Sequence, residues 1–311
     1  MSLQVQSPAR DAFPSLVRGI RAGAHSFLWT GHFTGKEELL FAEAAQCGFD
    51  GVEIALSDPG AIDWRSVASL ADRYSLRVML CATQLPGLSL ASGDADVRAA
   101  AVQHISTLLD RTRELGSGLL TGPLLNPVGA LSGVPPTAAE FAALREGLSA
   151  VAGLAEQRGV RIAIEPLNRF QGYLMTRVED GLRLCEAVGS AQLGLLLDLF
   201  HMNIEEDDPA ASIRRAAERC FHVHVSSSSR GAPGTDAADW PALRAALEDI
   251  GYAGWITVEA FCFSEADAVA KAHLWHPPAA TSLQTAQRSI DHLRHVFGTA
   301  GTMVAAGVGR R

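Results

Sequence analysis

Short apolar runs alternate with longer segments of helical periodicity along the whole chain. The short runs have the length and residue types of β-strands, and glycines or prolines bound several of them. They cover residues 20–28, 51–56, 76–82, 117–122, 161–165, 193–198, 221–225 and 254–259. The pattern therefore predicts eight strands.

Helical segments separate these strands, at residues 36–47, 63–74, 94–115, 137–158, 176–188, 209–219, 240–250 and 282–297. Asp63, Thr137 and Asp239 stand where side chains cap helix starts, and Gly48 and Gly159 fall just past helix ends. Eight strand–helix units predict an α/β fold, a closed (β/α)8 TIM barrel in a single domain. The segment WTGHFTGKEE after the first strand lacks the glycine fingerprint of a dinucleotide-binding fold.

Neither a shift in composition nor a Pro/Ser-rich linker divides the 311 residues. We therefore expect one barrel domain over residues 1–298. The last residues, 299–311, are rich in glycine and alanine and end in two arginines. This segment is predicted to be a flexible C-terminal tail.

Charge and cysteine content narrow the class of partner. The formal net charge is -8, from 34 acidic against 26 basic residues, which disfavours binding to nucleic acid or to an anionic membrane. No signal-peptide core opens the chain, and no run reaches the roughly 18 apolar residues of a membrane span. The five cysteines are scattered without a CxxC pair, as in a reducing compartment. We expect a cytoplasmic protein that acts on a small neutral or metal-bound substrate.

Four polar residues stand at the ends of the last four predicted strands: Glu165, Asp198, His224 and Glu259. Barrel enzymes carry their active sites at the carboxyl ends of the strands, and consecutive strands are neighbours. Any one of these residues alone is as well explained by a helix cap or an ion pair, but four together favour a shared site. Three carboxylates side by side need a neutralising cation, and this donor set suits Mn²⁺, Mg²⁺ or Co²⁺. His222 lies one layer deeper and is expected to be packed.

Four segments carry a resemblance to a known family. They are IEPLNRF (164–170), LDLFHMNIEE (197–206), HVH with the following Arg230, and ITVEAF (256–261). Together they resemble the ketose 3-epimerases of the tagatose and psicose type, which belong to the xylose isomerase-like barrels. The resemblance is close over residues 160–262. In the first half it is looser and rests on GFDGVEI, LCATQLP and SGDADVR.

The resemblance implies roles for particular residues. Glu165, Asp198, His224 and Glu259 match the ligands of one divalent metal ion, with Mn²⁺ the first expectation, and the two glutamates match the acid/base pair. Other positions match groups that contact the sugar or line its pocket: His201, Arg230, Gln171 and Cys81. Gln171 and Ser227 stand where the family often has glutamates, and Ala260 replaces a proline, so the identity of the sugar stays open. Relatives form dimers and tetramers, so a homo-oligomer is a reasonable expectation.

The implied reaction is C3 epimerisation of a ketose through a cis-enediolate. Removal of a proton on one face and delivery on the other requires two opposed acid/base groups, and a metal ion stabilises the enediolate. Aldose–ketose isomerisation, hydroxypyruvate-type isomerisation and keto-inositol dehydration share this logic. A metal-dependent hydrolase of the apurinic endonuclease type is disfavoured, since strands three and four end without further histidines. A non-catalytic sugar-binding barrel is the third alternative.

Several other residues are weaker candidates. His25, Trp29 and Phe33 follow or end the first strand, where they either line the pocket or pack at the barrel mouth. Glu53 could face the barrel or the helices, and a structural role is expected. The Ser226–Ser229 run is more simply a polar loop than a phosphate site, and His273 and His276 are expected in a lid or interface segment.

Overall fold

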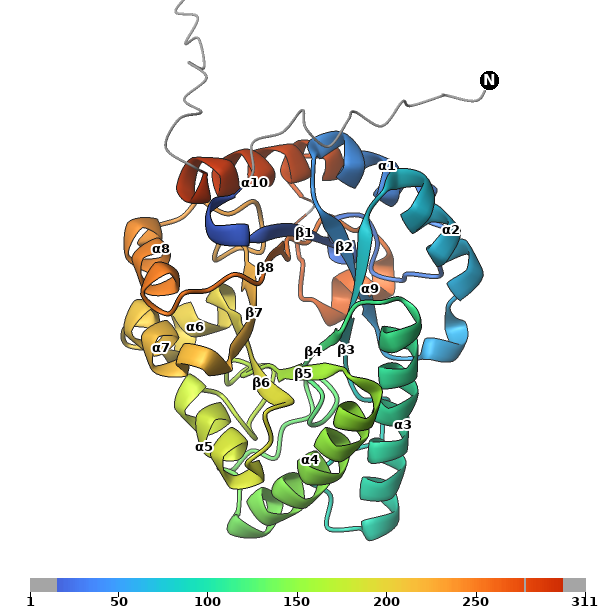
Figure 1. Cartoon of the computed structure of the whole chain (residues 1–311), viewed down its shortest axis with the longest axis vertical. Coiled ribbons are helices and arrows are strands. Elements are labelled where there is room, and N and C mark those ends of the chain that lie inside the picture. The colour runs from blue at the N-terminus through green and yellow to red at the C-terminus, as the bar shows by residue number, and fades with distance from the viewer. Residues whose placement is uncertain (1–15, 277, 299–311) are drawn as a thin grey trace, which may run out of the picture.

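A closed barrel of eight parallel strands forms the centre of the molecule, as predicted (Figure 1). The computed structural model describes residues 16–276 and 278–298. The strands follow one another around the barrel in chain order, and β1 closes it by pairing with β8. They are β1 Arg21–His25, β2 Gly51–Leu56, β3 Arg77–Ala82, β4 Leu119–Gly122, β5 Arg161–Ile164, β6 Leu193–Asp198, β7 Cys220–Val225 and β8 Trp255–Val258.

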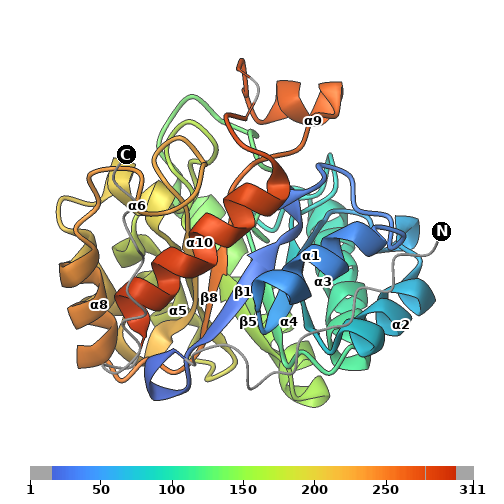
Figure 2. The ribbon, with the colours of Figure 1, turned by 90° about the horizontal axis from the view of Figure 1, so that it is seen from above.

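The helices surround the strands as an outer layer, apart from α9, which lies beyond one end of the barrel (Figures 1 and 2). They are α1 Glu38–Cys47, α2 Trp64–Tyr74, α3 Ala95–Glu114, α4 Ala138–Arg158, α5 Val178–Val188, α6 Leu199–Glu205, α7 Pro209–Ala216, α8 Trp240–Asp249, α9 Ala266–Lys271 and α10 Ser282–Phe297. All eight predicted helices are present. The two short helices α6 and α9 were not predicted, since each has fewer than eight residues and shows little periodicity.

Local capping explains where several helices begin and end. The hydroxyl of Thr137 accepts a hydrogen bond from the Glu140 amide, and the Glu140 side chain bonds back to the Thr137 amide, which forms a complete capping box. Asp63 and Asp239 cap α2 and α8 through their carboxylates, as the sequence predicts. Gly159 ends α4 with φ 65°, a left-handed conformation that favours glycine.

Two predicted elements differ at their ends. The first strand stops at His25, and residues Ser26–Leu28 form a 3-10 turn (η3) instead of extending the strand to residue 28. The helix predicted over 209–219 ends at Ala216 and continues as a 3-10 turn (η5) over Ala217–Arg219, with φ 46° at Ala217. Apolar pattern alone does not separate these turns from the elements that they extend.

Most of the apolar core lies between the strands and the helices. A small separate cluster occupies the barrel interior: Leu119, Ala163, Leu196 and Phe221. Gly23 of β1 also faces inward, where a Cβ atom would collide with the Thr257 hydroxyl. Polar groups fill much of the remaining interior, and several of them belong to the candidate site.

The carboxyl ends of the strands point toward the side of the molecule that carries α9 (Figure 2). Leu16 and Gly298 form an isolated antiparallel bridge, so the two ends of the described chain meet. The predicted tail over 299–311 lies outside the described residues. Within the part of the chain that the structure describes, no helix has both the length and the apolar character needed to cross a bilayer.

Candidate active site

Four buried side chains meet at the carboxyl ends of β5 to β8. Asp198 is the last residue of β6 and His224 lies near the end of β7, while Glu165 and Glu259 directly follow β5 and β8. One potential ligand atom from each residue lies within 4.8 Å of those of the other three. The structure therefore brings together the four residues that the sequence grouped.

Arg230 supplies the positive charge that this acidic group needs. Its Nη1 donates hydrogen bonds of 2.8 Å to both Asp198 Oδ2 and Glu259 Oε2. The guanidinium also lies over the Phe200 ring, 3.9 Å from the ring centroid. Arg230 is buried and has φ 58°, an unfavourable backbone angle for a residue with a Cβ atom. The strained turn thus directs the guanidinium into the site.

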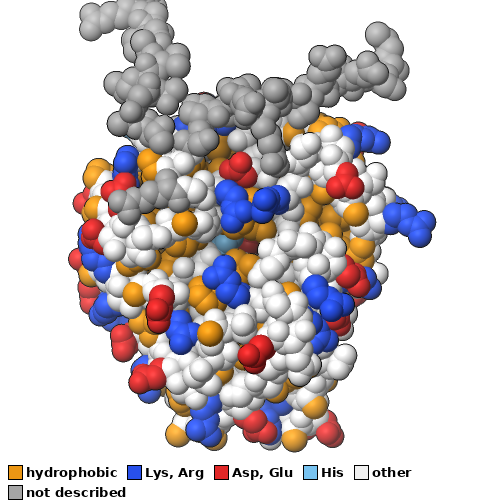
Figure 3. Space-filling view, viewed as in Figure 1, with side chains coloured by type: hydrophobic (Ala, Val, Ile, Leu, Met, Phe, Trp, Pro, Cys, Tyr) orange, Lys and Arg blue, Asp and Glu red, His pale blue; other side chains and the backbone are white. Residues whose placement is uncertain are grey.

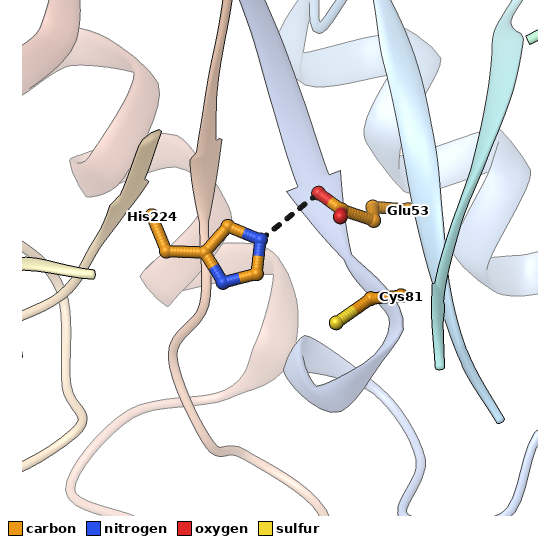
Figure 4. A group of neighbouring side chains, drawn as sticks. All are labelled: Glu53, Cys81 and His224. Carbon is orange, nitrogen blue, oxygen red and sulfur yellow. Dashed lines mark hydrogen bonds and ion pairs between the residues drawn. The ribbon is translucent and has the colours of Figure 1, made fainter. Parts of the chain in front are cut away.

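Glu53 of β2 faces into the barrel and contacts the imidazole of His224. Its Oε2 lies 3.1 Å from His224 Nε2 and 2.8 Å from His222 Nε2, and its Oε1 accepts a hydrogen bond of 2.6 Å from the Thr121 hydroxyl. Figure 4 shows the contact between Glu53 and His224. A carboxylate on one imidazole nitrogen orients the ring and leaves the other nitrogen for a ligand role. Sequence reasoning left open which face Glu53 occupies, and the interior position gives it a direct link to the site.

Cys81 of β3 completes a second group with Glu53 and His224 (Figure 4). Burial, reinforced by the negative charges of Glu53, Glu165 and Glu259, raises the pKa of its thiol well above the usual value. The side chain is therefore a neutral thiol at the wall of the site.

His201 of α6 lies against the four-residue group with a defined tautomer. The Asn168 amide N–H donates to His201 Nδ1 over 3.2 Å, and Asn168 Nδ2 lies 2.9 Å from the same atom. Both Asn168 groups are donors, so Nδ1 accepts and the proton of the neutral ring is on Nε2, although Arg230 Nη2, also a donor, lies 3.3 Å from that Nε2. Nε2 lies 3.5 Å from both Glu165 Oε1 and Asp198 Oδ2. Burial lowers the pKa of His201 to about 4, which keeps the ring neutral.

Gln171 is linked to His201 indirectly, through Asn168. Its Oε1 accepts a hydrogen bond of 2.8 Å from Asn168 Nδ2, the amide that contacts His201. Gln171 is half-buried in the segment after β5. The structure thus connects Gln171 to His201 through Asn168, a residue that sequence reasoning did not single out.

The two glutamates of the group have opposite proton affinities in the metal-free protein. Burial and the negative charge of Glu259 raise the pKa of Glu165 well above its usual value. Burial opposes ionisation of Glu259 as well, but Arg230 and His224 outweigh it and lower the pKa of Glu259 below its usual range. In the metal-free protein Glu165 therefore holds its proton more tightly than Glu259 does.

The donor set fits a divalent cation. Three carboxylates and one imidazole are ligands that Mn²⁺, Mg²⁺ and Co²⁺ accept. Among the described residues, His224 Nδ1 is buried without a hydrogen-bond partner, although Glu259 Oε2 lies 3.3 Å away. An unpartnered nitrogen aimed into a carboxylate group is what a metal-binding histidine presents. The group can therefore hold one metal ion.

The weaker sequence candidates divide into two sets. His25 is fully buried beside the site, with its ring centroid 5.5 Å from that of His224. Trp29 instead donates to Glu43 over 2.6 Å, and Phe33 packs on Phe41 with centroids 6.4 Å apart. The partners of both aromatic residues therefore lie on α1.

The loop after β7 and the segment after α9 have local partners of their own. Ser227 Oγ accepts from the Gly231 amide, and the Ser228 amide donates to Asp236. The serine run is therefore an internally bonded polar loop. His273 packs against Trp275 after α9, with ring centroids 5.6 Å apart. Neither histidine of that segment belongs to a metal-ligand group among the described residues.

Comparison with known proteins places the chain. Residues 41–295 match the family described as "Xylose isomerase-like TIM barrel". A "Probable ketose 3-epimerase" from Synechocystis sp. is 38% identical over 280 residues, which cover 90% of this chain and 98% of the relative. An L-ribulose 3-epimerase from Mesorhizobium japonicum is 34% identical, with 78% of this chain and 81% of the relative covered.

A solved structure supports the same placement. The D-allulose 3-epimerase from Methylomonas sp., in complex with D-allulose, superimposes with a TM-score of 0.85 at 27% identity. The match covers 91% of this chain and 99% of the other. The chain is thus a carbohydrate epimerase by its relatives in sequence and in structure. It belongs to the ketose 3-epimerase family, within the xylose isomerase-like TIM barrels.

Proposed function

We propose that the protein epimerises a free ketose at C3 with one divalent metal ion, Mn²⁺ as the first choice. Glu165, Asp198, His224 and Glu259 hold the ion in this proposal. The observation that carries it is the approach of four buried ligand atoms to within 4.8 Å at the ends of adjacent strands. Relatives named as L-ribulose and D-allulose 3-epimerases support a ketose of that size as the substrate.

The two glutamates act as the acid/base pair. They come from β5 and β8, so two strands separate them around the rim, and this separation suits proton removal and delivery on opposite faces of a sugar. A bound divalent cation supplies positive charge that stabilises the enediolate formed when the C3 proton leaves. Glu165 and Glu259 exchange roles between the forward and reverse reactions.

Two neighbouring side chains orient the sugar oxygens. His201 offers the N–H of Nε2 on the side of Glu165 and Asp198, because Asn168 occupies its other nitrogen. Arg230 offers guanidinium N–H groups from the turn after β7. Cys81 contributes to the wall of the pocket, and Gln171 acts on the sugar side through Asn168 and His201.

Deuterium exchange tests this proposal. Metal content is measured first, and the chelated enzyme is then incubated in D₂O with Mn²⁺ and D-fructose, D-allulose, D-tagatose or L-ribulose. We expect deuterium at C3 of a ketose together with its C3 epimer, and no exchange when the metal is withheld. The proposal is contradicted if the protein binds no divalent ion, or if none of the four ketoses takes up deuterium at C3.

The same experiment separates the alternatives. An aldose–ketose or hydroxypyruvate-type isomerase gives an aldose or aldehyde product, and a dehydratase gives loss of water. A hydrolase of the endonuclease type needs further histidine ligands from β3 and β4. The metal-ligand groups of the described residues contain His224 as their one histidine.

The domain bounds, cell location and oligomeric state are inferred from the sequence. We propose a single barrel domain over residues 1–298 in a cytoplasmic protein, and a homo-oligomer as its assembly. Gel filtration with light scattering measures the assembly directly. A monomer at micromolar concentration contradicts that part of the proposal and leaves the chemistry untouched.

A further inference from the structure

The opposite end of the barrel, at the amino ends of the strands, contains a cavity of about 450 Å³. Figure 3 views this end and shows arginine or lysine side chains gathered around a central hollow. The lining residues come from the first positions of the strands and the loops before them. This cavity is remote from the metal-ligand group, which lies at the carboxyl ends of the strands.

Two arginines reach the cavity from opposite sides of the barrel. Arg21 is the first residue of β1 and Arg161 is the first residue of β5, and these strands are four positions apart in the ring of eight. The Arg21 guanidinium lies 4.8 Å from the centroid of the Trp255 ring. The Arg161 guanidinium lies 4.6 Å from that of Phe221. Stacking on an aromatic ring holds each planar group in place and leaves its edge free to donate hydrogen bonds.

Neither arginine has an acidic partner among the described residues. Other arginines, such as Arg158 and Arg230, contact a carboxylate within 4.0 Å, but none of the ion pairs between described residues includes Arg21 or Arg161. Arg21 Nε is buried and has no hydrogen-bond acceptor within residues 16–276 and 278–298. Glu218, the one acid among the lining residues, is exposed and forms no ion pair in the described structure. A buried unpaired donor is costly unless a ligand satisfies it.

We propose that this cavity is a binding site for a small oxyanion ligand, a phosphate monoester in the first instance. Guanidinium groups bind phosphate and carboxylate through paired charge-assisted hydrogen bonds. The Trp255 and Phe221 rings and Ile250 give the cavity apolar wall for the organic part of such a ligand. A volume of about 450 Å³ lies in the range typical of small-molecule sites. The chain as a whole is acidic, so a local pair of uncompensated cations is selective for anions.

Titration calorimetry on the full-length protein tests the proposal. Inorganic phosphate, glycerol 3-phosphate and citrate are titrated separately at constant ionic strength, so that a phosphate ester is distinguished from free phosphate and from a carboxylate. We expect saturable binding with one site per chain, tightest for glycerol 3-phosphate. Arg21→Met and Arg161→Met should each weaken it about tenfold or more, the usual effect of removing a charged hydrogen-bond donor.

Arg183→Met is the matched control, because Arg183 is also exposed and also stacks on a ring, that of Phe141, with 5.6 Å to the centroid. This variant should bind like the parent protein. Arg161 is exposed, so Arg161→Met should keep the fold, and circular dichroism with the epimerase rate checks this. Lack of saturable binding of all three probes overturns the proposal. Equal weakening by all three arginine variants also overturns it, since the effect would then come from net charge.

Discussion

The two halves of the barrel contribute differently to the site. Strands β5 to β8 supply the four proposed metal ligands, whereas β1 to β4 supply groups that surround them: His25, Glu53, Cys81 and Thr121. In the second half, the potential ligand atoms of the four residues lie close together at the carboxyl ends of the strands. Those of the first half contact the ligands from beneath or beside, as Glu53 does with His224.

The difference shows that direct ligation and orientation are separable tasks. A metal ligand must be a carboxylate or imidazole at the end of a strand, and such residues can be identified from the sequence. A supporting residue must only reach a ligand across the barrel, and Glu53 does so from β2 to β7, strands that are not neighbours. Substitutions in the two halves should therefore differ in the size of their effects.

Removal of an acid/base group in the second half should cause the largest loss. Glu165→Gln and Glu259→Gln should each lower kcat for ketose epimerisation about 10³-fold, within the range for loss of general acid/base catalysis. The amide keeps the shape of the side chain but cannot accept and return the proton. Glu146→Gln is the control, since its side chain is 75% exposed and lies on α4. Unchanged deuterium exchange in both site variants contradicts the assignment.

A stability measurement tests the first half through His25. Burial is the main cause that lowers the pKa of His25 to about 4, from about 6.5 in an unfolded chain. Between these pH values the unfolded chain binds a proton that the folded protein does not. Stability is therefore fully present above pH 6.5 and should fall by about 3 kcal/mol as the pH drops to 4. Urea titrations of the chelated protein measure the slope.

His201 should add to the same slope, because burial also lowers its pKa to about 4. His25→Gln should flatten the dependence on pH in this window, and the exposed His295→Gln should leave it as it is. A His25→Gln variant with the same slope as the parent between pH 4 and pH 6.5 would mean that folding does not keep His25 neutral in this window.

The support from Glu53 can be measured without reference to turnover. Glu53→Gln should weaken Mn²⁺ binding about 10- to 100-fold, as expected when an outer carboxylate no longer orients a ligand histidine. Thr121→Val removes the hydroxyl that donates to Glu53 over 2.6 Å, so it should have a smaller effect in the same direction. Electron paramagnetic resonance of free Mn²⁺ gives both affinities. Equal Mn²⁺ affinity in Glu53→Gln and the parent protein would show that the orientation of the His224 ring does not depend on the Glu53 carboxylate.

The smallest effect is expected at Gln171. Gln171→Ala removes one hydrogen bond to Asn168, while the Asn168 amide still donates to His201. Loss of this neutral bond should reduce kcat/KM by about two- to tenfold, since such bonds are worth about 1 kcal/mol. Comparison of D-allulose with L-ribulose shows whether the loss depends on the sugar. A drop as large as that of Glu165→Gln would place Gln171 on the substrate directly.

Much of the fold and site could be predicted because both depend on local pattern. Strand runs, caps and the strand-end positions of Glu165, Asp198, His224 and Glu259 are visible along the chain. Contacts across the barrel are not. Which way Glu53 faces depends on the register of β2 with its neighbours, and the role of Asn168 depends on how the loop after β5 meets α6.

The arginine-lined cavity escaped prediction for a related reason. Arg21 and Arg161 begin their strands, where conserved chemistry is not expected in a barrel and where charged residues are ordinary. Only closure of the sheet places β1 opposite β5 and brings two arginines that are far apart in the sequence to one cavity.

The hydrogen bonds of Asp198 limit the conformational entropy of its side chain. Its Oδ1 accepts a hydrogen bond of 2.9 Å from the Phe200 amide as the N-cap of α6, while its Oδ2 faces Arg230. The carboxylate thus loses its rotational entropy when the chain folds and α6 forms. The Asp198 side chain is already held in one rotamer before a cation or sugar binds. Binding therefore carries no entropy cost for ordering this side chain.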